Sequence, residues 1–197
     1  MIFVTKAEGG VSYVSPEWSA FTGQAADDAV GHGWFACVHP DDREPAITFL
    51  RSARDQQSEF SLRLRLRRVD QSYAWVMIGA VPSYGPPDNT FLGYLGSMTE
   101  IAVSGSEPLT AYGTLNRFVP PPMSPTTPPG STLEAVADYL LIAHGLIEQD
   151  HAKEMLPVLR QALMVAGSLL GREPITGGTV WSGRRWFSEW RTEDGAV

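Results

Sequence analysis

Residues 59–81 read EFSLRLRLRRVDQSYAWVMIGAV, and this stretch decides the fold class. In its first half apolar and polar side chains alternate, with Phe60 and the leucines on one face and serine and arginines on the other, which is the pattern of a strand with one buried face. Residues 70–72 predict a turn because they combine aspartate, glutamine and serine. Residues 73–81 are apolar on both faces, so they predict a strand in the centre of a sheet.

The rest of the first hundred residues predicts further strands and the helices between them. Two short apolar runs form a hairpin around Gly9 and Gly10, because glycine supplies the backbone conformation that tight turns need. We expect Ser15 to be the N-cap of a short helix and Asp41 the N-cap of a longer one. Outside residues 59–81, the predicted strands cover residues 2–5, 11–15 and 91–101. This order of elements indicates an α+β fold, with a five-stranded antiparallel sheet and helices on one face.

Composition and charge exclude several classes of protein. The chain has 197 residues and a formal net charge of -7, which argues against a nucleic-acid partner because such proteins present a basic face to phosphate. A single cysteine, Cys37, excludes an intramolecular disulfide. No apolar stretch approaches the ~18 residues that span a membrane, and the N-terminus resembles neither a signal peptide nor an anchor. We therefore expect a cytoplasmic protein without a membrane partner.

A series of short motifs then resembles a known family. The matching segments are residues 18–23 (WSAFTG), 31–34 (GHGW), 38–42 (VHPDD), 60–75 and 93–101. In this order they resemble the PAS family, in the bacterial form that ends with a three-strand motif, and the resemblance covers residues 8–102. It implies a sensory or interaction domain, since PAS domains bind small molecules or cofactors, dimerise or dock partners. Fold alone does not choose among these roles.

The resemblance also implies where a ligand would bind, between the inner face of the sheet and the helices. Such a pocket would be lined by large apolar side chains from both layers. The candidates are Phe21, Trp34, Phe49, Leu62, Leu64, Met77 and Met98. The same residues could instead form a packed core, and the sequence leaves both interpretations open.

Flavin and haem, two cofactors of the family, each need a particular residue at a particular position. A flavin photosensor of the LOV type needs a reactive cysteine, and aligning Gly31 with that motif's glycine places Trp34, not Cys37, at the reactive position. A haem sensor of the family needs an axial histidine within the long helix, and residues 41–54 contain none. We therefore expect no bound cofactor, with a haem- or flavin-binding sensor as the alternative.

The chain changes character after its first half. Ser131 and Glu134 form a capping box at the start of an amphipathic helix, and Pro157 either kinks a second helix or begins a new one. The predicted segments are 1–104 (PAS domain), 105–130 (proline-rich linker), 131–172 (two amphipathic helices) and 173–197 (a tail rich in tryptophan and arginine).

Short amphipathic helices cannot hide their apolar stripes alone, so we expect residues 131–172 to mediate dimerisation or docking. The candidate interface residues are Leu140, His144, Leu163, Trp186 and Trp190. His144 invites comparison with the phosphoacceptor histidine of kinases, but glycine, leucine and isoleucine follow it where an acidic residue is usual. The sequence favours an interface role for this histidine.

Nothing in the residue pattern indicates catalysis: we find no paired carboxylates, nucleophile and base, phosphate loop or metal cluster. The expected function is a non-enzymatic PAS sensory and protein-interaction protein in bacterial signal transduction. The expected partner is a second copy of the chain or a signalling protein, and a small-molecule ligand is compatible with the fold. The alternatives are a ligand- or cofactor-binding sensor and a histidine-phosphotransfer or kinase-derived protein.

Overall fold

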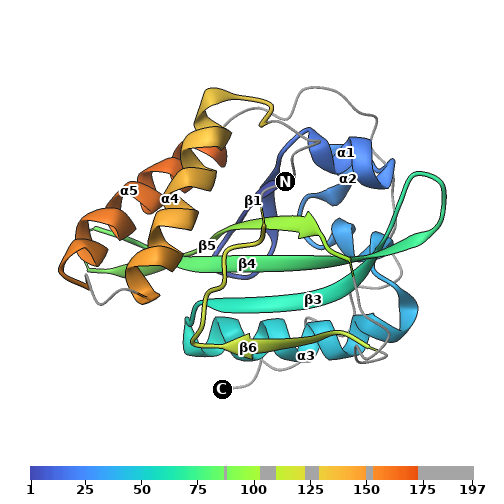
Figure 1. Ribbon diagram of the computed structural model, residues 1–197, viewed down its shortest axis with the longest axis horizontal. Coiled ribbons are helices and arrows are strands. Elements are labelled where there is room, and N and C mark those ends of the chain that lie inside the picture. The colour runs from blue at the N-terminus through green and yellow to red at the C-terminus, as the bar shows by residue number, and fades with distance from the viewer. Residues whose placement is uncertain (87, 103–109, 123–128, 150–152, 173–197) are drawn as a thin grey trace, which may run out of the picture.

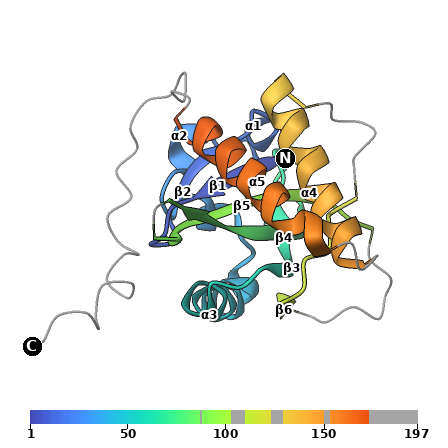
Figure 2. The ribbon, with the colours of Figure 1, turned by 90° about the vertical axis from the view of Figure 1, so that its left-hand side faces the viewer.

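The computed structural model describes residues 1–86, 88–102, 110–122, 129–149 and 153–172. A single antiparallel sheet in the strand order β2-β1-β5-β4-β3-β6 separates two layers of helices (Figures 1 and 2). Its strands are β1 (Ile2–Thr5), β2 (Val11–Val14), β3 (Phe60–Arg67), β4 (Tyr73–Gly85), β5 (Thr90–Glu100) and β6 (Tyr112–Leu115). The α-helices are α1 (Glu17–Thr22), α2 (Ala26–Ala29), α3 (Pro40–Gln56), α4 (Thr132–Gln149) and α5 (Leu156–Leu170), with 3₁₀ helices at Gly33–Cys37 and Lys153–Met155.

Residues 59–81 form the two strands that their periodicity predicts. Strand β3 buries Phe60, Leu62, Leu64 and Leu66 in the core between the sheet and helices α1 to α3, which we call the inner core. Strand β4 is central, because it pairs with β3 on one side and with β5 on the other. The predicted α+β class and antiparallel sheet are confirmed.

Both predicted N-caps are wrong, although both helices form. The Ser15 hydroxyl accepts a hydrogen bond from the Ile2 amide (3.0 Å) and so ties the start of β1, while Pro16 occupies the N-cap of α1. Helix α3 begins one residue before Asp41, and the His39 side chain accepts from the Asp41 amide. For α3 the shift has a simple cause, since Pro40 occupies the first helical position, where its missing N–H costs nothing.

The sheet gains a sixth strand inside the segment that the sequence predicts to be a linker. Strand β6 pairs with β3 from Phe60↔Leu115 to Arg63↔Tyr112. It covers the backbone groups of β3, which would otherwise be an exposed edge. The segment 105–130, which has the composition of a linker, therefore contains a short edge strand.

After β6 the chain crosses the outer face of the sheet in contact with two glycines. A Cβ added to Gly79 of β4 would lie 2.7 Å from the Phe118 ring, and one added to Gly145 of α4 would lie 2.7 Å from Pro120 Cδ. Such distances are shorter than packed atoms tolerate, so both positions need glycine to leave room for this crossing segment. Phe118 is buried there.

Helices α4 and α5 cover the outer face of the sheet within the same chain (Figure 2). The Ser131 hydroxyl accepts from the Glu134 amide (3.2 Å), as a capping box requires, but the Glu134 carboxylate bonds to the Gly130 amide and the Tyr13 hydroxyl. Pro157 lies in the first turn of α5, so it begins a new helix. The outer core consists of Ile2, Val4, Tyr13, Val81, Leu95, Phe118, Ala137, Leu141, Leu163, Ala166 and Leu170.

Among the helices that the structure describes, none combines the length and apolar character needed to cross a membrane.

Candidate functional site

A small cavity lies within the inner core, between the sheet and helices α1 to α3. Its free volume is about 70 Å³ and most of its lining is apolar or aromatic. Sites for drug-sized ligands measure roughly 300–1,000 Å³, so this cavity suits only a molecule of a few heavy atoms. The lining includes Phe3, Val14, Trp34, Ile78, Tyr94 and Met98.

One part of the cavity wall is polar and basic. His32, Arg51 and Arg54 contribute to the lining, and the Arg54 guanidinium also pairs with the Asp55 carboxylate at 3.1 Å. Burial lowers the pKa of His32, the charge of Glu8 opposes that shift and the charge of Arg54 reinforces it. These groups favour a ligand that has an apolar part and a hydrogen-bond-accepting or anionic end.

Strand geometry connects this cavity to the outer core. Phe3 of β1 lines the cavity, whereas its neighbours Ile2 and Val4 pack in the outer core. Tyr94 of β5 likewise lines the cavity and Leu95 belongs to the outer core. Because successive residues of a strand point to opposite faces, β1 and β5 each contribute neighbouring residues to the cavity wall and to the core beneath α4 and α5.

A fully buried carboxylate joins helix α3 to the sheet. Asp42 accepts hydrogen bonds from the Arg65 amide (2.7 Å) and Nε (3.0 Å), and from the Ala111 amide (3.1 Å) just before β6. The hydrogen bond that Arg65 donates to Asp42 is the largest cause that raises the pKa of Arg65, and burial opposes it. This pair holds three separate elements together, so we assign it a structural role.

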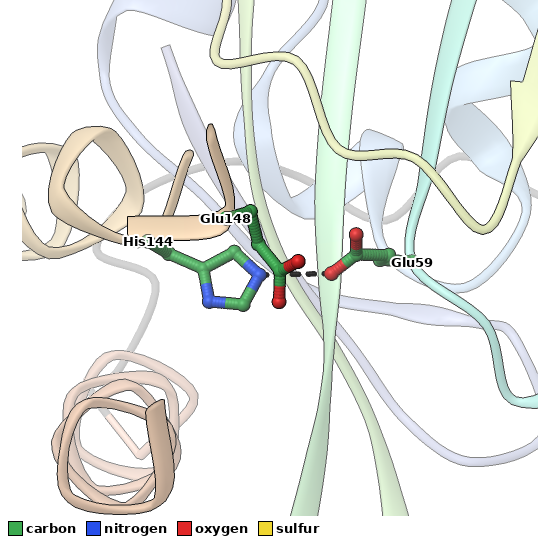
Figure 3. A group of neighbouring side chains, drawn as sticks. All are labelled: Glu59, His144 and Glu148. Atoms are coloured by element: carbon green, nitrogen blue, oxygen red, sulfur yellow. Dashed lines mark hydrogen bonds and ion pairs between the residues drawn. The ribbon is translucent and has the colours of Figure 1, made fainter. Parts of the chain in front are cut away.

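A second buried polar cluster joins α4 to the sheet. His144 Nε2 lies 2.8 Å from the Glu59 carboxylate, which precedes β3, and the Glu148 carboxylate approaches both groups from the next turn of α4 (Figure 3). His144 is fully buried. Burial raises the pKa of Glu59, but the hydrogen bond and charge of His144 lower it, and the net shift is downward.

The family model described as the PAS fold matches residues 11–96. This segment is a PAS domain. The match begins at β2 and runs through helices α1 to α3 and strands β3 and β4 to the middle of β5. It covers most of the cavity wall but leaves out β1, which contributes Phe3, and Met98 at the end of β5.

Two curated relatives each align with about half of the chain. An uncharacterized protein of Sinorhizobium fredii, y4lL, is 38% identical over 101 residues, which is 51% of this chain and 12% of that protein. The peroxide stress-activated histidine kinase mak1 of Schizosaccharomyces pombe is 23% identical over 109 residues, 51% of this chain and 7% of the kinase. The aligned region is thus a small part of each relative.

Solved structures also align with about half of the chain. A PAS domain from Colwellia psychrerythraea is 24% identical, with a TM-score of 0.43 over 51% of this chain and 84% of that one. The N-terminal domain of a diguanylate cyclase with PAS/PAC sensor from Marinobacter aquaeolei is 16% identical, with a TM-score of 0.46 over 50% of this chain and 92% of that one.

The structure distributes the predicted pocket residues of the PAS domain over several places. Trp34 and Met98 line the cavity. Leu62 and Leu64 are fully packed in the inner core, where Phe21 and Phe49 are partly buried. Met77 alternates with Val76 and Ile78 of the inner core, so it faces the opposite side of the sheet. Sequence reasoning missed Phe3, Val14 and Tyr94, which strand alternation on β1, β2 and β5 could have indicated.

The predicted interface residues of the helices face the PAS domain itself. Leu163 and His144 are buried against the chain's own sheet, and Leu140 packs partly against the same outer core. These three residues are therefore covered within one copy. A phosphoacceptor role for His144 is incompatible with this burial. Trp186 and Trp190 lie outside the described residues.

The opposite faces of α4 and α5 carry exposed apolar side chains. They are Val136, Tyr139, Leu146, Val158, Val165 and Leu169. We call this set the outer helical face.

The thiol of Cys37 is fully buried in the inner core. Burial is the largest cause that raises its pKa.

Proposed function

We propose that this chain is a non-enzymatic sensory module of bacterial signal transduction, in which the cavity of the PAS domain binds a small ligand and helices α4 and α5 transmit its presence. One observation carries the proposal. Residues that line the cavity alternate along β1 and β5 with residues that hold the helices, as Phe3 does with Ile2 and Val4. A ligand that moves the inner side chains therefore changes the surface on which the helices rest.

The chemistry of the lining supports a particular class of ligand. Aromatic and aliphatic side chains enclose most of the space, and His32 and Arg51 contribute polar groups to the wall. A short-chain carboxylate such as butyrate has both features, whereas haem and flavin far exceed a cavity of about 70 Å³.

An NMR titration of the full chain tests this proposal. Butyrate and 1-butanol, which differ chiefly in charge, would be added to isotope-labelled protein. We expect butyrate to shift the amide signals of Phe3 and Tyr94, together with signals from α4 and α5. Val14→Ile adds a methyl group to the cavity lining and should abolish the response. Shifts restricted to the protein surface, or equal responses of wild type and V14I, would contradict the proposal.

We also propose that a second copy of the chain covers the outer helical face. Its support is that both of these neighbouring helices carry exposed apolar side chains, which a partner surface would remove from water. Sedimentation of the full chain should give a dimer, and Val158→Glu together with Val165→Glu should give a monomer that still unfolds in one cooperative transition, because neither side chain belongs to the outer core. A wild-type monomer at high concentration would contradict this part.

A further inference from the structure

The cluster of Glu59, His144 and Glu148 has the composition of a transition-metal site. Its three potential ligand atoms, one imidazole nitrogen and two carboxylate oxygens, all lie within 4.8 Å of one another. Figure 3 shows the three side chains converging, two from α4 and one from the chain that enters β3. Imidazole and carboxylate groups together are the donors that Zn²⁺ prefers when thiolates are absent.

The spacing along α4 is suited to chelation. His144 and Glu148 are four residues apart, so they lie on one helical face in successive turns. The same i, i+4 spacing brings paired ligands to zinc in other helices. Glu59 is distant in sequence, and its other oxygen accepts a hydrogen bond from the Phe118 amide (3.2 Å), which fixes the carboxylate toward His144.

The distances require little rearrangement. Bonds of roughly 2.0–2.2 Å in a tetrahedral site place ligand atoms roughly 3.3 Å apart. His144 Nε2 and the Glu59 carboxylate are already 2.8 Å apart, so a slight separation of these two groups would admit an ion. The Glu148 side chain is 27% exposed, which leaves a path from solvent and a fourth position for water.

The charges of the cluster also favour a divalent cation, although Arg160 of α5 competes with the ion for Glu148. Two carboxylates and a neutral imidazole offset the charge of a divalent ion. Arg160 of α5 lies 3.5 Å from the Glu148 carboxylate and its side chain is half exposed, so it can swing away when an ion enters. We propose that Glu59, His144 and Glu148 bind one zinc-type divalent ion, which clamps α4 to the start of β3. With the ion on Nε2, the single proton of the neutral imidazole lies on Nδ1.

The experiment uses the full chain after treatment with a chelator. ZnCl₂ titration followed by calorimetry should give one equivalent bound and a higher melting temperature, because the ion binds only the folded arrangement. CoCl₂ should give the visible absorption of a four-coordinate site. Absence of binding, or of a thermal effect from a bound ion, would overturn the proposal.

Matched variants identify the ligands. Glu148→Gln should weaken Zn²⁺ binding by about tenfold or more while the metal-free protein melts as the wild type does, since this side chain is partly exposed. Glu154→Gln makes the same change in charge at an exposed neighbouring position and should leave affinity unchanged. Arg160→Gln should strengthen binding by removing the competing cation. Equal affinity of E148Q and wild type, or loss of binding in His39→Ala at the surface pair with Asp41, would assign the ion to another site.

Discussion

Replacing Leu163 by alanine tests whether helices α4 and α5 unfold together with the PAS domain. Leu163 is 2% exposed and packs in the outer core beside Val4, Leu95 and Leu170. Truncating a buried leucine to alanine costs about 2–5 kcal/mol, because it removes apolar contacts and leaves a cavity. For a chain of this size, each kcal/mol lowers the melting temperature by about 2–4 °C. A loss near 3 kcal/mol therefore predicts a decrease of about 6–12 °C.

The assay is calorimetry combined with urea unfolding of the full chain, followed by tryptophan fluorescence and circular dichroism. We expect a single transition that moves as a whole, since Ile2 and Val4 of β1 belong to the same core as Leu163. Leu169→Ala is the matched control on the same helix. Its side chain is 45% exposed, and its truncation should cost about 1 kcal/mol or less.

Two outcomes would refute the reasoning. One is a profile with two transitions, of which only the weaker responds to L163A. The other is an equal effect of L163A and L169A. Either would mean that the helices rest on the sheet without contributing to its stability.

Three further predictions concern buried polar groups. Asp42→Asn should cost about 3 kcal/mol in urea unfolding, because Arg65 loses its charged partner inside the fold, and a loss below about 1 kcal/mol would contradict this role. Asp138→Asn should raise the melting temperature at pH 7. Burial is the main cause that raises the pKa of Asp138; Glu17 and Glu134 raise it further, and the N-terminal ammonium lowers it. Because the folded pKa lies above the unfolded one, the charged carboxylate destabilises the fold at pH 7, and the gain from asparagine should disappear as the pH falls toward about 4. A gain that persists at that pH would show another cause. Cys37 should react with a thiol reagent far more slowly in native protein than in urea, as its burial raises the thiol pKa, and rapid native labelling would show that the inner core opens readily.

Local periodicity was sufficient for the centre of the sheet. The alternation from Phe60 to Leu66 is a property of consecutive residues, so it predicts the buried face of β3 without knowledge of partners. Strand β6 has no such pattern. Its existence depends on the open edge of β3, where Gly113 pairs with Leu62, and this information is not local.

The candidate site shows a similar division. Large apolar residues could be predicted to lie in the core, but a cavity forms where side chains fail to fill space. Leu62 and Leu64 are so well packed that they leave no room, while Phe3 and Tyr94 border the free volume. The approach of Glu59 to His144 spans 85 residues of sequence, and neither residue stands in a motif that would have paired them.

The crossing segment at Phe118–Pro120 has a consequence for anyone who recombines this domain with other modules. Gly79 on the sheet and Gly145 on α4 accommodate that segment from opposite sides. A chimaera joined after residue 104 would keep Gly79 but lose Gly145 and the crossing segment. The surface of the sheet that the segment covers at Gly79 would then be exposed. We therefore expect a transferable unit to run through α5, and homologues with bulkier residues at position 79 to route their chains differently.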